Sequence, residues 1–253
     1  PVAAVDEKKY CESRSSDMNL VSSLSTTFRN KPFVIYLIGN VSFWFGFNII
    51  SAGVTYYITV LLELPLDRVT YFMAATFGTA IVFMPVLNLV CKNIGKRNTM
   101  ALLLFMFALI LPSIYFLNVR ALPIDNVLLG YILLGLAGIP LSGLFIVPDA
   151  IVADLTDYDE MLTGQRHEAM YFGAQGFCLK VIMGVSTFLM TLIFSLFGNT
   201  ITCPLGVQLT GPVAGFFALV GMTAFLFFPP ELEREVSEFR MRKETAQAAG
   251  APD

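Results

Sequence analysis

The sequence predicts an all-α membrane protein with six transmembrane helices. Its mean hydropathy is +0.70, and only 14% of its residues are charged, whereas about a quarter of the residues of soluble domains are charged. The apolar residues form six blocks of roughly 20 or more residues each, which is long enough to cross a ~30 Å hydrocarbon core. These blocks cover residues 32–62, 69–91, 98–118, 126–148, 169–197 and 210–230. We therefore expect a bundle over 32–230, preceded by a cytoplasmic linker at 1–31 and followed by a charged cytoplasmic tail at 231–253.

The basic residues predict the orientation. Of 16 Lys and Arg residues, 13 fall on the side that holds both termini, two (Arg68 and Arg120) fall on the other side, and Lys180 lies within a span. Cytoplasmic loops carry the excess of Lys and Arg, so both termini are expected in the cytoplasm. The first 31 residues are polar and lack the apolar segment of a signal peptide. The plasma membrane is the expected location.

The spans differ in polarity. Spans 98–118 and 210–230 are apolar almost throughout and are expected to face lipid. Span 32–62 carries a polar stripe within an ~80° sector of one helix face. The stripe comprises Asn40, Trp44, Asn48, Ser51 and Thr55. It is explained either by hydrogen bonds between helices or by a cavity wall in which Trp44 stacks on a substrate, and we take Trp44, Asn48 and Ser51 as candidate pathway residues.

Span 126–148 has a second candidate face, which carries Tyr131 and Ser142. Pro140 and Pro148 interrupt the hydrogen bonds of this helix. Broken helices are tolerated at membrane depth where protein or a water-filled cavity satisfies the freed carbonyls. A simple packing kink remains the alternative.

Lys180 is the only charged residue within a span. It lies about twelve residues into 169–197, roughly 18 Å from the start, where a charge costs about 2.5–3.5 kcal/mol on insertion scales. Its face carries Gly173, Gly176 and Gly184. The predicted spans contain no carboxylate, so a counter-ion must come from another polypeptide segment, the substrate or a bound ion. The alternative is a structural pair between Lys180 and a carbonyl or polar group of another helix.

Two segments carry a resemblance to a known family. DLTDYDEMLTGQRHEAMYFGAQGFCLK, residues 154–180, resembles the segment joining the tenth and eleventh helices of glycoside-pentoside-hexuronide:cation symporters, the melibiose-permease branch of the major facilitator superfamily. NIGKRNTM, residues 93–100, resembles the basic loop between the eighth and ninth helices of that family. The matching positions are Ala153, Asp154, Asp157, Tyr158, Thr163, Gly164, Arg166 and Glu168, with Lys180 at the distance of the family's eleventh-helix lysine.

This resemblance implies that the six spans are helices seven to twelve, the carboxyl-terminal bundle of a transporter. The amino-terminal six-helix half would then lie on a missing segment or a separate chain. The implied function is symport of a sugar or glycoside with Na⁺ or H⁺ by alternating access. His167, Glu168, Ala169 and Lys180 also resemble the related sodium-dependent lysophosphatidylcholine symporters, which remain an alternative, as does a membrane scaffold that transports nothing.

The charges of 154–168 predict a cytoplasmic gate. Asp154 and Asp157 are one helical turn apart, Glu168 lies at the start of a span, and Arg166, Lys96 and Arg97 are the available cations. We expect Asp157 to pair with Arg166, joined by Lys96 or Arg97, and we expect Asp159 and Glu160 to be solvated. An enzyme is not expected, because the sequence has neither a Gly-x-Ser-x-Gly elbow nor the His/Cys spacing of a metal site. A cofactor, a metal site and nucleic-acid binding are likewise not expected.

Overall fold

The computed structural model describes residues 27–117, 125–144, 146–164 and 167–248. Within these residues the chain is helical, and its only bridge of β type joins Thr200 and Cys203. Six helical segments are long and apolar enough to cross a membrane, which confirms the predicted fold class. The helices are α3 (Lys31–Tyr56), α4 (Val69–Ile94), α5 (Lys96–Ile110), α6 (Asn126–Leu144), α7 (Val147–Thr163), α8 (Glu168–Phe197), α9 (Leu205–Leu226) and α10 (Leu232–Ala248).

The first and third spans are extended by short helices of other types. A π-helical turn, η2 (Tyr57–Leu61), continues α3, and a 3₁₀ helix, η4 (Leu111–Phe116), continues α5 from Pro112 onward. α3 starts with Pro32 in its first turn, where a missing N–H costs nothing. The side chain of Asn30 caps this start by accepting a hydrogen bond from the N–H of Phe33.

The fourth span is interrupted before Pro148, whereas Pro140 lies inside the continuous helix α6. α6 stops at Leu144, and α7 begins at Val147 with Pro148 in its first turn. The helical segment then continues to Thr163, beyond the predicted apolar block at 126–148. Proline is compatible with the start of a helix because its fixed φ suits the first turn. Pro148 therefore restarts the helix, and α7 carries the acidic residues beyond the apolar part of the bundle.

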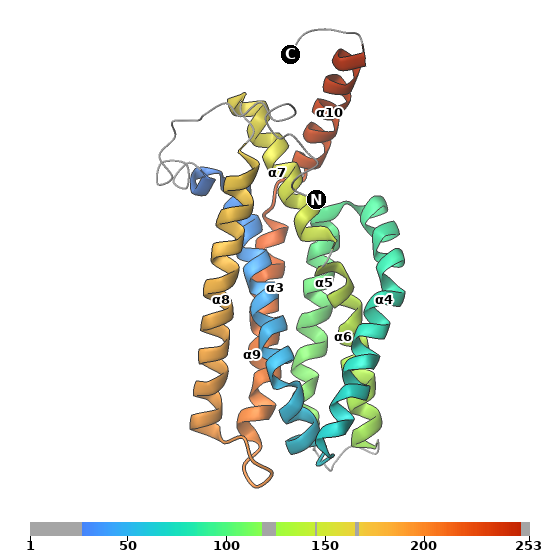
Figure 1. Cartoon of the computed structure of the whole chain (residues 1–253), viewed down its shortest axis with the longest axis vertical. Coiled ribbons are helices and arrows are strands. Elements are labelled where there is room, and N and C mark those ends of the chain that lie inside the picture. The colour runs from blue at the N-terminus through green and yellow to red at the C-terminus, as the bar shows by residue number, and fades with distance from the viewer. Residues whose placement is uncertain (1–26, 118–124, 145, 165–166, 249–253) are drawn as a thin grey trace, which may run out of the picture.

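The bundle is built around α9, which packs extensively against α3 and α5, while α4 packs on α6 and α8 lies along α3 (Figure 1). The most exposed spans are α4, with 11% of its apolar window buried, and α8, with 22%, against 44% for α5 and 39% for α9. The spans of α5 and α9 are nonetheless less buried than those of α3 and α6, at 56% and 53%, so the expectation that 98–118 and 210–230 face lipid stays a prediction. An apolar helix suits lipid and helix packing equally well, so hydropathy alone does not separate the two.

The two ends of the bundle carry different features (Figure 1). At one end, the carboxyl end of α7, the connection between α4 and α5, and α10 come together. At the other end, Gly198 adopts a φ of 83° and turns the chain from α8 toward α9. Nearly all of the charged contacts described below lie at the first end.

Candidate functional site

The predicted polar stripe of α3 divides between two environments. The Asn48 amide donates to Ser186 Oγ at 2.5 Å and to the Met183 carbonyl oxygen at 3.2 Å, and it also contacts Thr187 Oγ1 at 3.3 Å. This is the interhelical hydrogen bonding that was one of the two expectations for the stripe. Asn48 therefore joins α3 to α8 in this conformation.

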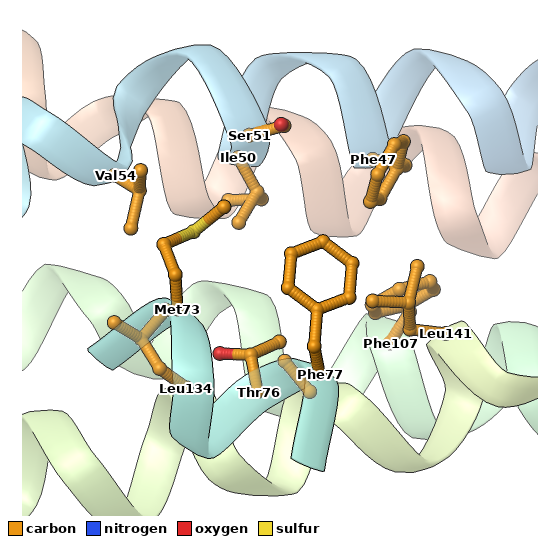
Figure 2. A pocket seen from close by; sticks show the side chains of 11 residues that line it. Phe47, Ile50, Ser51, Val54, Met73, Thr76, Phe77, Phe107, Leu134 and Leu141 are labelled. Carbon is orange, nitrogen blue, oxygen red and sulfur yellow. The ribbon is translucent and has the colours of Figure 1, made fainter. Parts of the chain in front are cut away.

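Ser51 lies one turn further along α3 and lines a pocket between α3, α4, α5 and α6. The pocket opens onto about 440 Å³ of space not filled by protein atoms. Met73 and Phe77 of α4 reach toward α3 across it (Figure 2). Its walls are Phe47, Ile50, Ser51, Val54, Met73, Thr76, Phe77, Phe107, Leu134, Ala137 and Leu141. Because the Thr76 hydroxyl already donates to the Phe72 carbonyl, Ser51 offers the uncommitted hydroxyl of this apolar pocket.

The other predicted pathway residues are packed in this conformation. Trp44 is half-buried and lies edge-on to Phe47, with ring centroids 5.6 Å apart. Tyr131 stacks on Phe72 of α4, with ring centroids 3.9 Å apart. Ser142 is fully buried and donates to the Ile139 carbonyl at 2.6 Å. The geometry thus gives Ser51 access to a pocket and gives Tyr131 and Ser142 packing contacts.

Lys180 lies on an open face of α8. Its side chain is exposed and has no hydrogen-bond or ion-pair partner among the described residues. A Cβ atom added at Gly173, Gly176 or Gly184 would meet no atom within 4 Å. Lys180 and these glycines therefore lie on one face of α8, and no described part of the bundle covers that face.

The acidic residues of α7 bind basic residues from two other segments. Asp154, which is 3% exposed, accepts from Lys96 Nζ at 2.5 Å. Arg240 of α10 contacts the second oxygen of the same carboxylate at 3.1 Å. Arg240 also donates from Nε to Asp157 Oδ2 at 2.6 Å. Lys96 and Asp154 were both predicted gate residues, but the expected pair was that of Asp157 with Arg166, and the contact with α10 was not expected.

Arg240 is the centre of this charged cluster. Partial burial lowers its pKa, but its hydrogen bond to Asp157 and the charges of both aspartates raise it by more, so the pKa lies above that of an ordinary arginine. Lys243, one turn further along α10, contacts Glu160 at 2.5 Å. We call Lys96, Asp154, Asp157, Glu160, Arg240 and Lys243 the charge cluster.

Two of the predicted gate residues, Arg97 and Glu168, lie outside the charge cluster. Arg97 donates to the carbonyls of Phe225 and Leu226 and so caps the end of α9 instead of pairing with an acid. Glu168 lies in the first turn of α8, where the helix dipole favours an anion. Arg166 lies outside the described residues, so the expected pair with Asp157 has no structural description; the described partner of Asp157 is Arg240.

Asp159 and Glu160 are not the solvated residues that we expected. Asp159 is 6% exposed and contacts His167 Nδ1 at 2.7 Å, and Glu160 contacts Lys243. His167, just before α8, thus contacts one of these acids of α7, and α10 contacts the other. These contacts bury two acids that would be exposed if the segment were a solvated loop.

Sequence reasoning missed the docking of α10. Leu232 and Val236 are buried at 2% and 1% exposure, and Glu233 accepts from the backbone N–H of Lys96 at 2.5 Å. The signal was an amphipathic pattern with Leu232, Val236 and Phe239 at positions i, i+4 and i+7, beside Arg240 and Lys243. The tail therefore binds the connection between α4 and α5 as well as α7.

Six helices long and apolar enough to span a membrane, an interrupted fourth span and a basic loop paired with acids of that span define a polytopic helical membrane protein. The model of the family described as MFS/sugar transport protein matches residues 2–231, and the chain belongs to this family of the major facilitator superfamily. The resemblance that the 154–180 segment suggested is thereby confirmed at the level of the family.

Three curated relatives are similar to the chain. An uncharacterized symporter of Synechocystis is 22% identical over 85% of this chain and 41% of its own length. The uncharacterized symporter YjmB of Bacillus subtilis is 27% identical over 90% of this chain and 46% of its own length. The isoprimeverose transporter of Lactiplantibacillus pentosus is 29% identical over 69% of this chain and 35% of its own length. The chain thus spans less than half the length of these relatives.

Proposed function

We propose that the chain forms the carboxyl-terminal bundle of a cation-coupled symporter that moves a sugar or glycoside by alternating access between two bundles. Na⁺ or H⁺ is the proposed coupling ion. The observation that carries this proposal is Lys180, an exposed cation roughly 18 Å into a spanning helix. A lysine at that depth is costly against lipid, and such residues face a bundle interior or a water-filled cavity.

The surroundings of Lys180 support a second bundle as the partner of this face. Glycines at 173, 176 and 184 leave the helix backbone open to close approach by another helix. Lys180 and a partner helix would then border a cavity between two bundles, as in transporters built from repeated bundles. The proposed partner is an amino-terminal six-helix half, on a preceding segment or a separate chain, which fits relatives more than twice the length of the match.

The same proposal gives the charge cluster a role. With both termini in the cytoplasm of a plasma-membrane protein, the cluster lies at the cytoplasmic end of the bundle. Lys96, Asp154, Asp157 and Arg240 join the α4–α5 connection, α7 and α10 there. We propose that these contacts stabilise one state of the transport cycle and must loosen in the other.

The test is uptake by the complete transporter, in which this chain is joined to its amino-terminal half, reconstituted in liposomes. Isoprimeverose serves as the sugar probe and lysophosphatidylcholine as the comparison, each with a sodium gradient, a proton gradient and no gradient. We expect accumulation of the sugar that one of the two gradients drives. Accumulation of the lysolipid alone would replace the sugar by a lysophospholipid, and no accumulation of a panel of sugars and glycosides under either gradient would contradict the proposal.

A further inference from the structure

Asn40 is a fully buried amide with no hydrogen-bond partner. Its exposure is 0%, and neither Oδ1 nor Nδ2 finds a partner in the structure. Leaving a buried donor and a buried acceptor unpaired is costly, and each such group in a native protein calls for an explanation. Among the buried amides of the described residues, it is the one with both ends unpaired.

The packing of α3 on α8 locates this amide. Three contacts between the helices join residues that are nearly the same number of positions apart in the sequence. Phe33 packs on Tyr171. Tyr36 Oη lies 3.3 Å from Gln175 Oε1, and Asn48 lies 2.5 Å from Ser186 Oγ. This register puts Asn40 one turn beyond Tyr36 on the same helix face. Helical side chains lean toward the amino end of their helix, so the Asn40 amide leans toward the level of Tyr36 and Gln175.

The neighbouring groups offer both donors and acceptors. The Tyr36 hydroxyl shares its single proton between Gln175 Oε1 and the Pro148 carbonyl, which is 3.2 Å away. Pro148 lies in the first turn of α7, directly after the interruption between α6 and α7. A buried polar region therefore extends from Asn40 to the point where the fourth span is broken.

The chemistry of the amide selects its ligand. A cation would bind Oδ1 but leave the Nδ2 protons facing a positive charge, and an anion would do the reverse. A hydroxyl group both donates and accepts, so it satisfies both ends by donating to Oδ1 and accepting from Nδ2. We propose that Asn40, Tyr36, Gln175 and the Pro148 carbonyl form a buried site for one hydroxyl group.

Two sources supply a hydroxyl. A resident water would use the site as buried waters commonly do, with two to four polar partners, and would hydrate the interrupted helix. A hydroxyl of the transported solute would use the same partners, and this source alone rests on the proposed function. The chemistry of the site is the same in both cases.

The test is the unfolding temperature of the purified chain in detergent, with Asn40→Leu as the variant. Leucine is similar in size and removes both polar atoms. If the site binds a hydroxyl, the variant strands its partners, and we expect the unfolding temperature to fall by roughly 2–4 °C. A fall without sugar identifies a resident water. A fall seen only with isoprimeverose, which then stabilises the wild type but not the variant, identifies a solute hydroxyl.

A double-mutant cycle separates a bound ligand from local packing. Asn40→Leu and Gln175→Leu should be non-additive, because a shared ligand couples them, whereas Asn40→Leu and Thr210→Val should be additive because Thr210 pairs with Tyr57 elsewhere. Asn40→Met replaces Asn40→Leu if the latter fails to fold, since methionine adapts to irregular spaces. An equal or higher unfolding temperature for the variant, with and without sugar, overturns the proposal. This measurement needs no transport, so it fails or succeeds independently of the proposed function.

Discussion

Arg240→Gln tests whether the charge cluster holds α10 on the bundle. The substitution removes the cation that contacts Asp157 and one of the two that contact Asp154. Hydrogen bonds to charged groups contribute about 1.5–3 kcal/mol when buried. The Arg240 side chain is 43% exposed, so solvent screens part of this, and Lys96 still neutralises Asp154. We estimate a loss of about 1–2 kcal/mol in the docking of α10.

A loss of this size corresponds to a change of roughly 5–30-fold in the docking equilibrium. Hydrogen-exchange mass spectrometry over Leu232–Ala248 reads this equilibrium directly, because undocking opens the amides of α10. Arg242→Gln is the matched control, since Arg242 is an exposed neighbour on the same helix and has no ion-pair partner among the described residues. Equal exchange in the two variants would refute the assignment of Arg240 as the anchor of α10.

The raised pKa of Arg240 also predicts how the result of the same assay depends on pH. A cation whose pKa is raised by folding contributes stability that is fully present below its unfolded pKa and is lost only above that value. Arginine is already protonated at every pH usable for the assay. Its contribution to α10 docking, corrected for intrinsic exchange, should therefore stay constant between about pH 7 and pH 9.

Two further predictions concern the ends of α4 and α3. Gly95→Ala should increase exchange in α10, because Gly95 has a φ of 83° and an added Cβ would lie 2.5 Å from Glu233 Oε2. Gly164→Ala is its control, because Gly164 has a φ of 70° and an added Cβ would meet no atom within 4 Å. Similar exchange in the two variants would mean that backbone strain alone causes the effect. In a background without native cysteines, Ser51→Cys should react with a small water-soluble thiol reagent, whereas Phe43→Cys and Phe45→Cys, at positions 1% exposed, should not. Faster labelling at the two phenylalanine positions would mean that the pocket is closed to water.

The sequence supports the prediction of six spans because spanning a bilayer requires a minimum length of apolar residues, and each segment meets it. The pair of Lys96 with Asp154 could also have been predicted, because the sequence places few cations in the loops near the acids of 154–160. Which way an apolar helix faces was not predictable. Lipid and a neighbouring helix are equally apolar, so the central position of α9 depends on tertiary packing that hydropathy does not encode.

The docking of α10 could not be predicted from the sequence for a different reason. Leu232 and Val236 supply only one turn of apolar pattern within a charged tail, and such a pattern is also typical of a solvated helix. The partners of its charges lie about 83 residues away on α7. Similarly, the stack of Tyr131 on Phe72 uses a polar-looking residue as a packing surface, which single-helix periodicity cannot distinguish from a cavity wall.

The most direct test of the central claim is Lys180→Leu in the complete transporter, with membrane abundance and gradient-driven uptake measured together. The substitution removes a costly charge from the membrane, so we expect abundance at or above that of the wild type. We also expect uptake to be lost, because the face of α8 that carries Lys180 would border the transport pathway. Normal uptake at normal abundance would contradict that assignment, and loss of abundance would make Lys180 a residue required for folding.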